Sequence, residues 1–278
     1  ENILPYQRPP LSKKYLMGEL EQERLLLKPQ SYYNENNIEV IKGLKVQEID
    51  RKKSKVFLDN GQALEYKNLF LGLGSEPRLL QKELIHGMSN INYIRNIGDV
   101  DLIAHKFNNK RKILILGGGF IGLEVASAAR KLGIEVTILE SQERILKRSS
   151  SEIVANYLKD IHVSNGVIIK EKTTVKKFLS KKNEFFGILT NNGEEINADL
   201  LIAGVGIEPN TLIASNAGLF IDNGIVINKN CRTSDPKIYA AGDCVSFPFN
   251  ENHIRLESVG NAIEQSEIAA ENVLGNKI

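Results

Sequence analysis

The sequence predicts an α/β protein of two similar domains, in which each parallel sheet carries a small antiparallel meander. Three observations lead to this fold class. The run 113–140, ILILGGGFIGLEVASAARKLGIEVTILE, reads as strand, glycine turn, helix and strand, and it ends on an acid. Another segment of the chain occurs in two copies that share the same turn residues. A short apolar strand at 238–240 leads into a Gly-Asp step, at the end of a strand where open α/β sheets hold ligands.

The glycine turn has the spacing G-x-G-x-x-G, with Gly117, Gly119 and Gly122 after the apolar strand Ile113–Leu116. The first glycine permits the tight turn, the second lets a pyrophosphate approach the backbone, and the third lets the helix pack on the strand. The helix N-terminus presents free N–H groups to the phosphates. A structural βαβ unit with a chance glycine cluster is the alternative. The register of strand, Ala-rich helix and terminal acid favours a Rossmann-like dinucleotide-binding domain.

The terminal acid is Glu140, which follows the second strand, Val136–Leu139. A carboxylate at this place can accept both hydroxyls of an adenine ribose, and it repels a 2′-phosphate. The acid therefore favours NAD(H). NADP(H) stays open as a second possibility because three cations follow closely: Arg144, Lys147 and Arg148.

Length and composition limit the possible classes of protein. With 278 residues the chain is long enough for about two domains and a sizeable core. A net charge of +2 gives no reason to expect nucleic acid or an anionic membrane as a partner. No apolar run approaches the roughly 20 residues that span a bilayer. The start has no charged region before an apolar stretch, so we expect no signal peptide and a cytoplasmic location.

The potential metal ligands are scattered along the chain. Cys231 and Cys244 form no C-x-x-C pair, which argues against a dithiol redox centre and a cysteine zinc site. The histidines suggest neither a catalytic triad nor a metal centre, and we expect no metal; they are His86, His105, His162 and His253.

The opening PYQRPPLSKKYL is rich in proline, so it should run extended and enter a helix near Ser12. Its cations Arg8, Lys13 and Lys14 either form a solvated face or meet an anionic cofactor, and their spacing does not decide between the two. Strands are predicted at 40–49, 55–58 and 69–71, with a turn at 59–61 and the elbow GLGSEPR after the third strand.

The segment from this meander to the elbow is repeated. VQEIDRKKSKVFLDNGQALEYKNLFLGLGSEPR is matched by VKKFLSKKNEFFGILTNNGEEINADLLIAGVGIEPN. Three pairs of punctuating residues keep the same offset, which indicates a duplicated unit: Gly61 with Gly193, Gly74 with Gly206, and Pro77 with Pro209. At this offset the glycine turn of the first copy falls before residue 1. We expect Glu1 to lie near the acid that closes that earlier βαβ unit.

The strand Ile238–Ala240 leads to Gly242, which lets Asp243 project from its carboxyl end. Ligands sit at such strand ends in open α/β sheets. Capping of the next segment is the alternative for Asp243, but its position and the duplication favour ligand contact. The closing RLESVGNAIEQSEIAAENVLG is predicted to be a helix that stops at Gly275.

Seven motifs in order carry a resemblance over essentially the whole chain: PYQRPPLSKKYL, LFLGLGSEPR, NYIRNIGDV, GGGFIGLEVA, GVGIEPN, IYAAGDC and RLESVGNAIEQ. Together they resemble the ferredoxin/rubredoxin/putidaredoxin reductases, a branch of the two-dinucleotide-domain flavoproteins that includes the apoptosis-inducing-factor-like oxidoreductases. The resemblance implies an FAD-binding domain in two segments, 1–107 and 230–278, around an NAD-binding domain at 108–229. The FAD glycine motif and the C-terminal αβ domain of that family are missing from this chain, and Leu71-Gly72-Leu73-Gly74 replaces its usual Ala-Thr-Gly.

The resemblance also implies roles for single residues. Lys13 should approach the flavin, with Glu124 beside it at the nicotinamide–flavin junction, and these two are the predicted catalytic residues. Glu124 alternatively complements the helix dipole. Val46 should meet the adenine through its backbone, Asp243 should hold the ribitol, and Val259 should lie by the flavin ring. The remaining FAD candidates are Arg95, Arg8 and Glu1. The NAD contacts are Gly117, Gly119, Phe120, Ile121, Gly122, Glu140 and Gly206.

The implied activity is that of an FAD-dependent NADH oxidoreductase. A hydride passes from nicotinamide C4 to flavin N5, and electrons then leave singly to a small iron–sulfur carrier of the ferredoxin or rubredoxin type. The protein is expected to be a monomer or a homodimer. An NADH oxidase or nitrite-reductase-like flavoprotein is one alternative. A non-catalytic NAD(H)-binding, redox-sensing flavoprotein is another.

Overall fold

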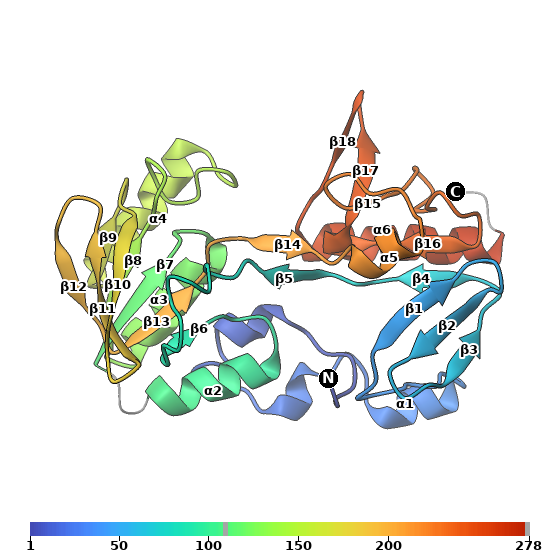
Figure 1. The fold of residues 1–278 in the computed structure, drawn as a ribbon, viewed down its shortest axis with the longest axis horizontal. Coiled ribbons are helices and arrows are strands. Elements are labelled where there is room, and N and C mark those ends of the chain that lie inside the picture. The colour runs from blue at the N-terminus through green and yellow to red at the C-terminus, as the bar shows by residue number, and fades with distance from the viewer. Residues whose placement is uncertain (108–110, 276–278) are drawn as a thin grey trace. The chain divides into compact units, whose positions relative to one another are not determined.

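The computed structural model describes residues 1–107 and 111–275 (Figure 1). By packing, the chain divides into two units. Unit 1 comprises Glu1–Ile3, Val40–Glu76 and Ile207–Ile278, and unit 2 comprises Leu4–Glu39 and Pro77–Gly206. These units group residues that pack together, whereas the domains predicted from the sequence group residues by cofactor. The boundaries after residues 107 and 229 therefore stay a prediction.

Unit 2 contains a five-stranded parallel sheet in the order β6-β13-β7-β8-β9. Its strands are β6 (Ile91–Asn92), β7 (Lys112–Leu116), β8 (Glu135–Leu139), β9 (Val167–Lys170) and β13 (Leu200–Ala203). The helices that accompany them are α2 (Ile97–Phe107), α3 (Phe120–Lys131) and α4 (Glu152–Ser164). The predicted strand, glycine turn, helix and strand of 113–140 are thus confirmed as β7, α3 and β8.

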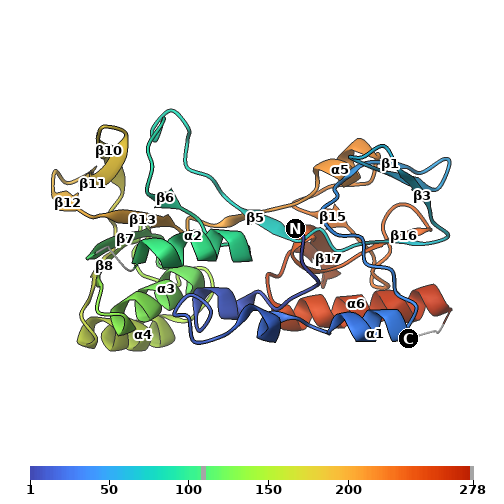
Figure 2. The same cartoon turned by 90° about the horizontal axis from the view of Figure 1, so that it is seen from below.

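A three-stranded antiparallel meander packs on this parallel sheet. Its strands are β10 (Val175–Lys181), β11 (Glu184–Thr190) and β12 (Glu195–Asn197). Because side chains alternate across a strand, Leu114 and Leu116 of β7 enter one buried cluster with Phe178 and Phe185 of the meander. Helices α3 and α4 lie on the opposite side of the sheet (Figure 2). The sheet is covered on both faces, as expected for a parallel sheet.

The opening segment of unit 2 differs from the prediction of a helix near Ser12. Two short 3-10 helices, η1 (Pro9–Ser12) and η2 (Gln22–Leu25), are followed by α1 (Gln30–Glu35). Prolines occupy the first positions of η1, where they need no N–H partner. The helix then ends, because Lys13 takes a non-helical backbone conformation with φ −126° and ψ −115°. Ser12 is therefore the last residue of a short helix and does not begin a longer one.

Unit 1 contains the other meander and the strand that ends near Asp243. Antiparallel strands β1 (Val46–Asp50), β2 (Lys55–Leu58) and β3 (Ala63–Glu65) precede β4 (Leu69–Leu71), which pairs in parallel with β16 (Ile238–Ala240). The other elements are β5 (Ser75–Pro77), β14 (Ile207–Pro209), α5 (Leu212–Asn216), β15 (Ile225–Val226), η3 (Gly242–Cys244), β17 (Val245–Phe249), β18 (Asn252–Ile254) and α6 (Val259–Leu274). One buried cluster joins β1, β2, β4, β16 and α6.

Two predicted element boundaries in unit 1 are wrong. The strand expected over 40–49 begins only at Val46, because Gly43 takes a left-handed φ of +74° and donates its N–H to the Glu1 carbonyl. The closing helix begins at Val259, where the Ser258 hydroxyl caps it by accepting the Asn261 N–H. Its predicted stop is confirmed, since Gly275 caps the helix with φ +84°.

The predicted repeat and the predicted fold class are both confirmed. Each copy folds as a three-stranded antiparallel meander followed by a strand in a parallel sheet. The matched turn glycines Gly61 and Gly193 have φ values of +84° and +86°. Gly74 and Gly206, which follow the return strands, also have positive φ values. Within the described residues, no helix is both long and apolar enough to cross a membrane.

Candidate functional site

The glycine loop between β7 and α3 leaves no room for side chains at two of its three glycines. Gly117 has φ +103°, and a Cβ placed on it would lie 2.2 Å from the Gly204 carbonyl oxygen. A Cβ on Gly122 would lie 2.1 Å from the Gly117 carbonyl oxygen. The first glycine therefore permits the turn beside the end of β13, and the third lets α3 approach the loop.

Gly119 has a different environment, because a Cβ on it would meet nothing within 4 Å. It is the N-cap of α3, and no side chain caps the helix there. The N–H groups in the first turn of α3 therefore have no side-chain cap and can donate to a ligand. The backbone beside them is open to approach. Phe120 and Ile121 border this approach with exposed fractions of 54% and 44%. This arrangement fits an anionic diphosphate.

Glu140 follows β8 and points its carboxylate back to the glycine loop. Oε2 accepts the Gly118 N–H at 2.7 Å, and Oε1 accepts the Gln142 N–H at 2.8 Å. The Ser141 hydroxyl adds a longer bond to Oε1, at 3.3 Å. A carboxylate has about four acceptor positions. Each oxygen is therefore anchored by one backbone N–H. Oε2 keeps capacity for one ribose hydroxyl, and Oε1 can accept a second one in place of the longer bond from Ser141.

Two of the three cations after Glu140 are engaged elsewhere. The Arg144 guanidinium donates to the carbonyls of Ile145 and Ser150, at 3.2 and 2.8 Å. Lys147 forms an ion pair with Glu143. Arg148 lies beside Gly206, since its Nη2 is 3.7 Å from a Cβ placed there. The sequence left NADP(H) open because of these cations, and this geometry weighs against it.

A second cluster joins η1 to the first turns of α3. Lys13 Nζ lies 2.8 Å from Glu124 Oε1, so these two predicted residues are in contact. The Ser12 hydroxyl donates to Glu124 Oε2. Lys13 also donates to the Pro9 carbonyl, at 3.0 Å. The expected proximity of Lys13 and Glu124 is observed, while their catalytic role stays a prediction.

A phenol and a carboxylate lie close to this cluster. The Tyr15 hydroxyl donates to Asp101 Oδ1 of α2 at 2.8 Å. Burial and the neighbouring Asp101 carboxylate raise the pKa of Tyr15 to about 12. The phenol therefore keeps its proton at neutral pH and, as a hydrogen-bond donor, links the segment after η1 to α2.

The residues predicted to contact FAD belong to both packing units, so their assembly into one site stays a prediction. Glu1, Val46, Asp243 and Val259 belong to unit 1, and Arg8, Lys13 and Arg95 belong to unit 2. In unit 2, Arg8 Nη1 donates to the Arg95 carbonyl at 2.6 Å, and the Arg95 N–H donates to Asp99 at 2.9 Å.

Asp243 lies in η3, directly after β16, at the strand end that the sequence predicted. Its Oδ2 accepts the Ser75 hydroxyl at 3.1 Å. The preceding Gly242 has φ +83°, and its N–H donates to the buried Gln265 side chain at 2.9 Å. Two fixed neighbours thus hold the Gly242–Asp243 turn. Val259, the first residue of α6, is 57% exposed.

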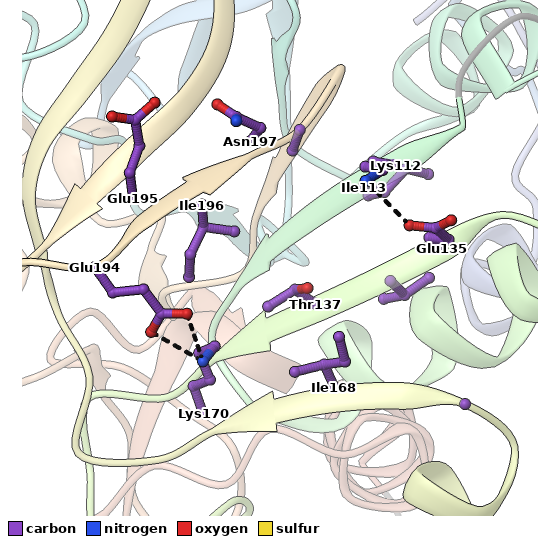
Figure 3. Close-up of a pocket in the computed structure, with 13 residues that line it drawn as sticks. Lys112, Ile113, Glu135, Thr137, Ile168, Lys170, Glu194, Glu195, Ile196 and Asn197 are labelled. Carbon is purple, nitrogen blue, oxygen red and sulfur yellow. Dashed lines mark hydrogen bonds and ion pairs between the residues drawn. The ribbon is translucent and has the colours of Figure 1, made fainter.

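The structure contains a cavity that the sequence did not predict. It measures about 440 Å³ and lies between the parallel sheet of unit 2 and β12. Ion pairs Lys112–Glu135 and Lys170–Glu194 border it on two sides, with Thr137 between them (Figure 3). None of the residues predicted for a cofactor lines it.

Neither cysteine belongs to a described binding site. Both thiols are free and buried, and burial raises the pKa of Cys231 to about 11. Among residues 1–107 and 111–275, no group of three or more histidine, cysteine or acidic side chains could hold a metal ion.

Sequence reasoning missed two residues that shape the candidate sites. Ser12 stands in the quoted PPLSK motif, but its sequence does not reveal that its hydroxyl meets a helix far along the chain. Ile145 is fully buried and would lie 2.6 Å from a Cβ on Gly118, so this residue, between the first two glycines of the motif, must also be small. An apolar residue after a run of polar ones was the available signal for Ile145.

Comparisons with known proteins add a family. The model of the family described as pyridine nucleotide-disulphide oxidoreductase matches residues 1–266. Rhodocoxin reductase of Rhodococcus erythropolis is 37% identical over 98% of this chain, and putidaredoxin reductase CamA of Pseudomonas putida is 38% identical over 96%. A crystal structure of a covalent putidaredoxin reductase–putidaredoxin complex has a TM-score of 0.94 and 37% identity, covering 99% of this chain and 67% of that one. The chain spans 64% and 65% of the lengths of the two curated relatives.

Proposed function

Because the chain belongs to the pyridine nucleotide-disulphide oxidoreductase family, we propose that it binds NAD(H) and FAD and acts as an NADH-oxidising reductase. Its electron acceptor would be a small iron–sulfur protein of the ferredoxin or rubredoxin type. The observation that carries the NAD(H) part is the anchored Glu140 carboxylate beside the uncapped N-terminus of α3. Curated relatives that match nearly all of this chain are named as reductases of redox carriers, which supports the acceptor class.

The residues of unit 2 would bind NADH in two places. The open backbone at Gly119 and the N–H groups of the first turn of α3 would take the diphosphate. Glu140 would accept the two hydroxyls of the adenine ribose, with its oxygens held in place by the N–H groups of Gly118 and Gln142. A 2′-phosphate would meet this carboxylate, and Arg144 is turned toward backbone carbonyls. NADH is therefore the favoured donor.

For FAD we propose the roles that the sequence implied. Lys13, paired with Glu124, would contribute positive charge near the flavin, and Asp243 would hold the ribitol. The bound nicotinamide and flavin would supply hydride transfer and the release of single electrons. The protein would position them and stabilise charge. Two free, buried thiols support a cytoplasmic location, since a reducing compartment keeps cysteines in this form.

The proposal is tested by the visible spectrum of the purified full-length protein. Flavin absorbance should be present, and NADH should bleach it rapidly under anaerobic conditions, with NADPH much slower. Addition of an oxidised ferredoxin or rubredoxin should restore the absorbance. Absence of flavin with NADH binding retained would overturn the reductase and favour a non-catalytic NAD(H)-binding protein. Rapid oxygen consumption with no transfer to any carrier would favour an NADH oxidase.

A further inference from the structure

We propose that Ser12 is a positioning residue, which fixes the Glu124 carboxylate so that Glu124 in turn fixes the Lys13 ammonium. This inference rests on the proposed function, because it assigns Ser12 a task in the pair expected at the nicotinamide–flavin junction. Ser12 itself need contact neither cofactor. Its test must therefore separate the failure of this inference from the failure of the proposed function.

The geometry gives each oxygen of Glu124 its own partner from the opening segment. The Ser12 hydroxyl donates to Oε2, and Lys13 Nζ lies 2.8 Å from Oε1. Ser12 is only 2% exposed, whereas the Lys13 side chain is 46% exposed. The donor of the Ser12 bond is thus buried and the bond is partly shielded from water, because the Glu124 side chain is 27% exposed, whereas the donor of the Lys13 bond faces water.

Because of this difference in exposure, we infer that the position of Lys13 depends on Glu124 and that the position of Glu124 depends on Ser12. An exposed ion pair has little energy of its own and holds a lysine only loosely. A hydrogen bond from a buried hydroxyl to a carboxylate is stronger and directional. Lys13 also has a second acceptor, the Pro9 carbonyl at 3.0 Å. Without the Ser12 hydroxyl, the carboxylate can rotate and the ammonium can remain with Pro9.

Both ends of the contact are held by their elements. Ser12 closes η1, in which the neighbouring Leu11 is also buried. Glu124 lies in α3, whose N-cap is Gly119 of the glycine loop. The Ser12–Glu124 bond therefore ties the opening segment to the helix that begins at the predicted nucleotide site.

The first test compares Ser12→Ala and Ser12→Thr in the full-length protein. Ser12→Ala should slow the NADH-dependent bleaching of the flavin about tenfold, the effect of losing one hydrogen bond to a charged group. The dissociation constant for NADH should stay within about twofold, since Ser12 lies outside the predicted NADH contacts. Ser12→Thr keeps a hydroxyl and should restore most of the rate. Ser164→Ala, which removes an exposed hydroxyl bonded to the Ile161 carbonyl, is the matched control.

The second test uses stability and needs no cofactor reaction. The free energy of unfolding is measured for Ser12→Ala, Glu124→Gln and the double variant. The two changes should be non-additive if the residues are coupled. Additive effects, or a Ser12→Ala protein with unchanged bleaching while Glu124→Gln is slow, would overturn the inference. If Glu124→Gln and Lys13→Met both bleach at the normal rate, the role of the pair in the proposed function fails, while the coupling cycle still reports on Ser12.

Discussion

The two copies of the repeat have the same local geometry and different surroundings. In each copy a glycine with φ near +85° lies in the turn between the second and third strands of the meander, Gly61 in the first copy and Gly193 in the second. The return strand of the second copy, β13, lies between β6 and β7 in the five-stranded sheet. The return strand of the first copy, β4, pairs with β16. Meanders with nearly the same turn geometry can therefore precede strands that join sheets of different size.

The difference between the copies indicates which features the proposed NADH binding depends on. The second copy is preceded by the glycine loop and by Glu140, so the segment from the end of β7 to the residue after β8 contains all of the predicted NADH contacts except Gly206. The first copy shares the meander and the elbow, but of the residues predicted for the flavin site it contains only Val46. The meander is the shared scaffold, and we expect the strand–turn–helix unit to hold the ligand.

The largest effect is expected in the glycine loop, which distinguishes the second copy. Gly117→Ala would place a Cβ 2.2 Å from the Gly204 carbonyl at a φ of +103°. Overpacking and the left-handed backbone should together lower the free energy of unfolding by about 3 kcal/mol or more. Denaturant unfolding measures the loss.

Gly119→Ala provides the control for this experiment. Its Cβ meets nothing within 4 Å, so its free energy of unfolding should change by no more than about 1 kcal/mol. NADH affinity should nevertheless fall, because the methyl group occupies the open approach to the backbone. A Gly119→Ala protein with normal affinity would mean that the diphosphate binds elsewhere.

The next effect concerns selectivity between the two nicotinamide cofactors. Glu140→Ala should weaken NADH binding by about 10- to 100-fold, the loss of hydrogen bonds to a charged group. NADPH should gain little, because Arg144 is held by the Ile145 and Ser150 carbonyls. Fluorescence titration with both nucleotides measures the ratio. Glu65→Ala, which removes an exposed acid paired with Lys55 away from the predicted NADH contacts, should leave both affinities unchanged. An unchanged ratio in Glu140→Ala would contradict the assignment.

The smallest effect tests whether the two meanders are equivalent. Gly61→Ala and Gly193→Ala each place a methyl group in open space at nearly the same positive φ. Each change should cost about 1 kcal/mol from backbone conformation alone. Denaturant unfolding of the two variants should give equal losses, with NADH affinity unaltered. A clearly larger loss at one glycine would show that its turn makes contacts that the other lacks.

The sequence predicted the parts of the fold that depend on local rules. The glycine loop, β7, α3, β8 and the repeat follow from turn residues and apolar periodicity over short distances. The boundary at Val46 was missed because the positive φ of Gly43 does not show in the apolar pattern. The short η1 was missed because proline starts a helix without fixing its length.

In the candidate site too, contacts between residues close in sequence could be predicted, whereas contacts between distant residues could not. Glu140 could be predicted because its strand and the glycine loop are adjacent in the chain. The cluster of Ser12, Lys13 and Glu124 joins residues more than one hundred positions apart, and the Ser12–Glu124 separation is 112. Only the resemblance to a family suggested that Lys13 and Glu124 meet. The engagement of Arg144 with backbone carbonyls depends on a loop conformation that residue types do not specify.

The packing units have a consequence for how the chain can be divided. Unit 1 is made of three separate stretches of sequence, and the second of them lies between the two stretches of unit 2. No single cut in the backbone can therefore release either unit whole. Each copy of the repeat is continuous in sequence, but neither unit is. A fragment that ends anywhere between residues 40 and 206 would lack strands that the rest of its own unit needs, such as β16 for β4.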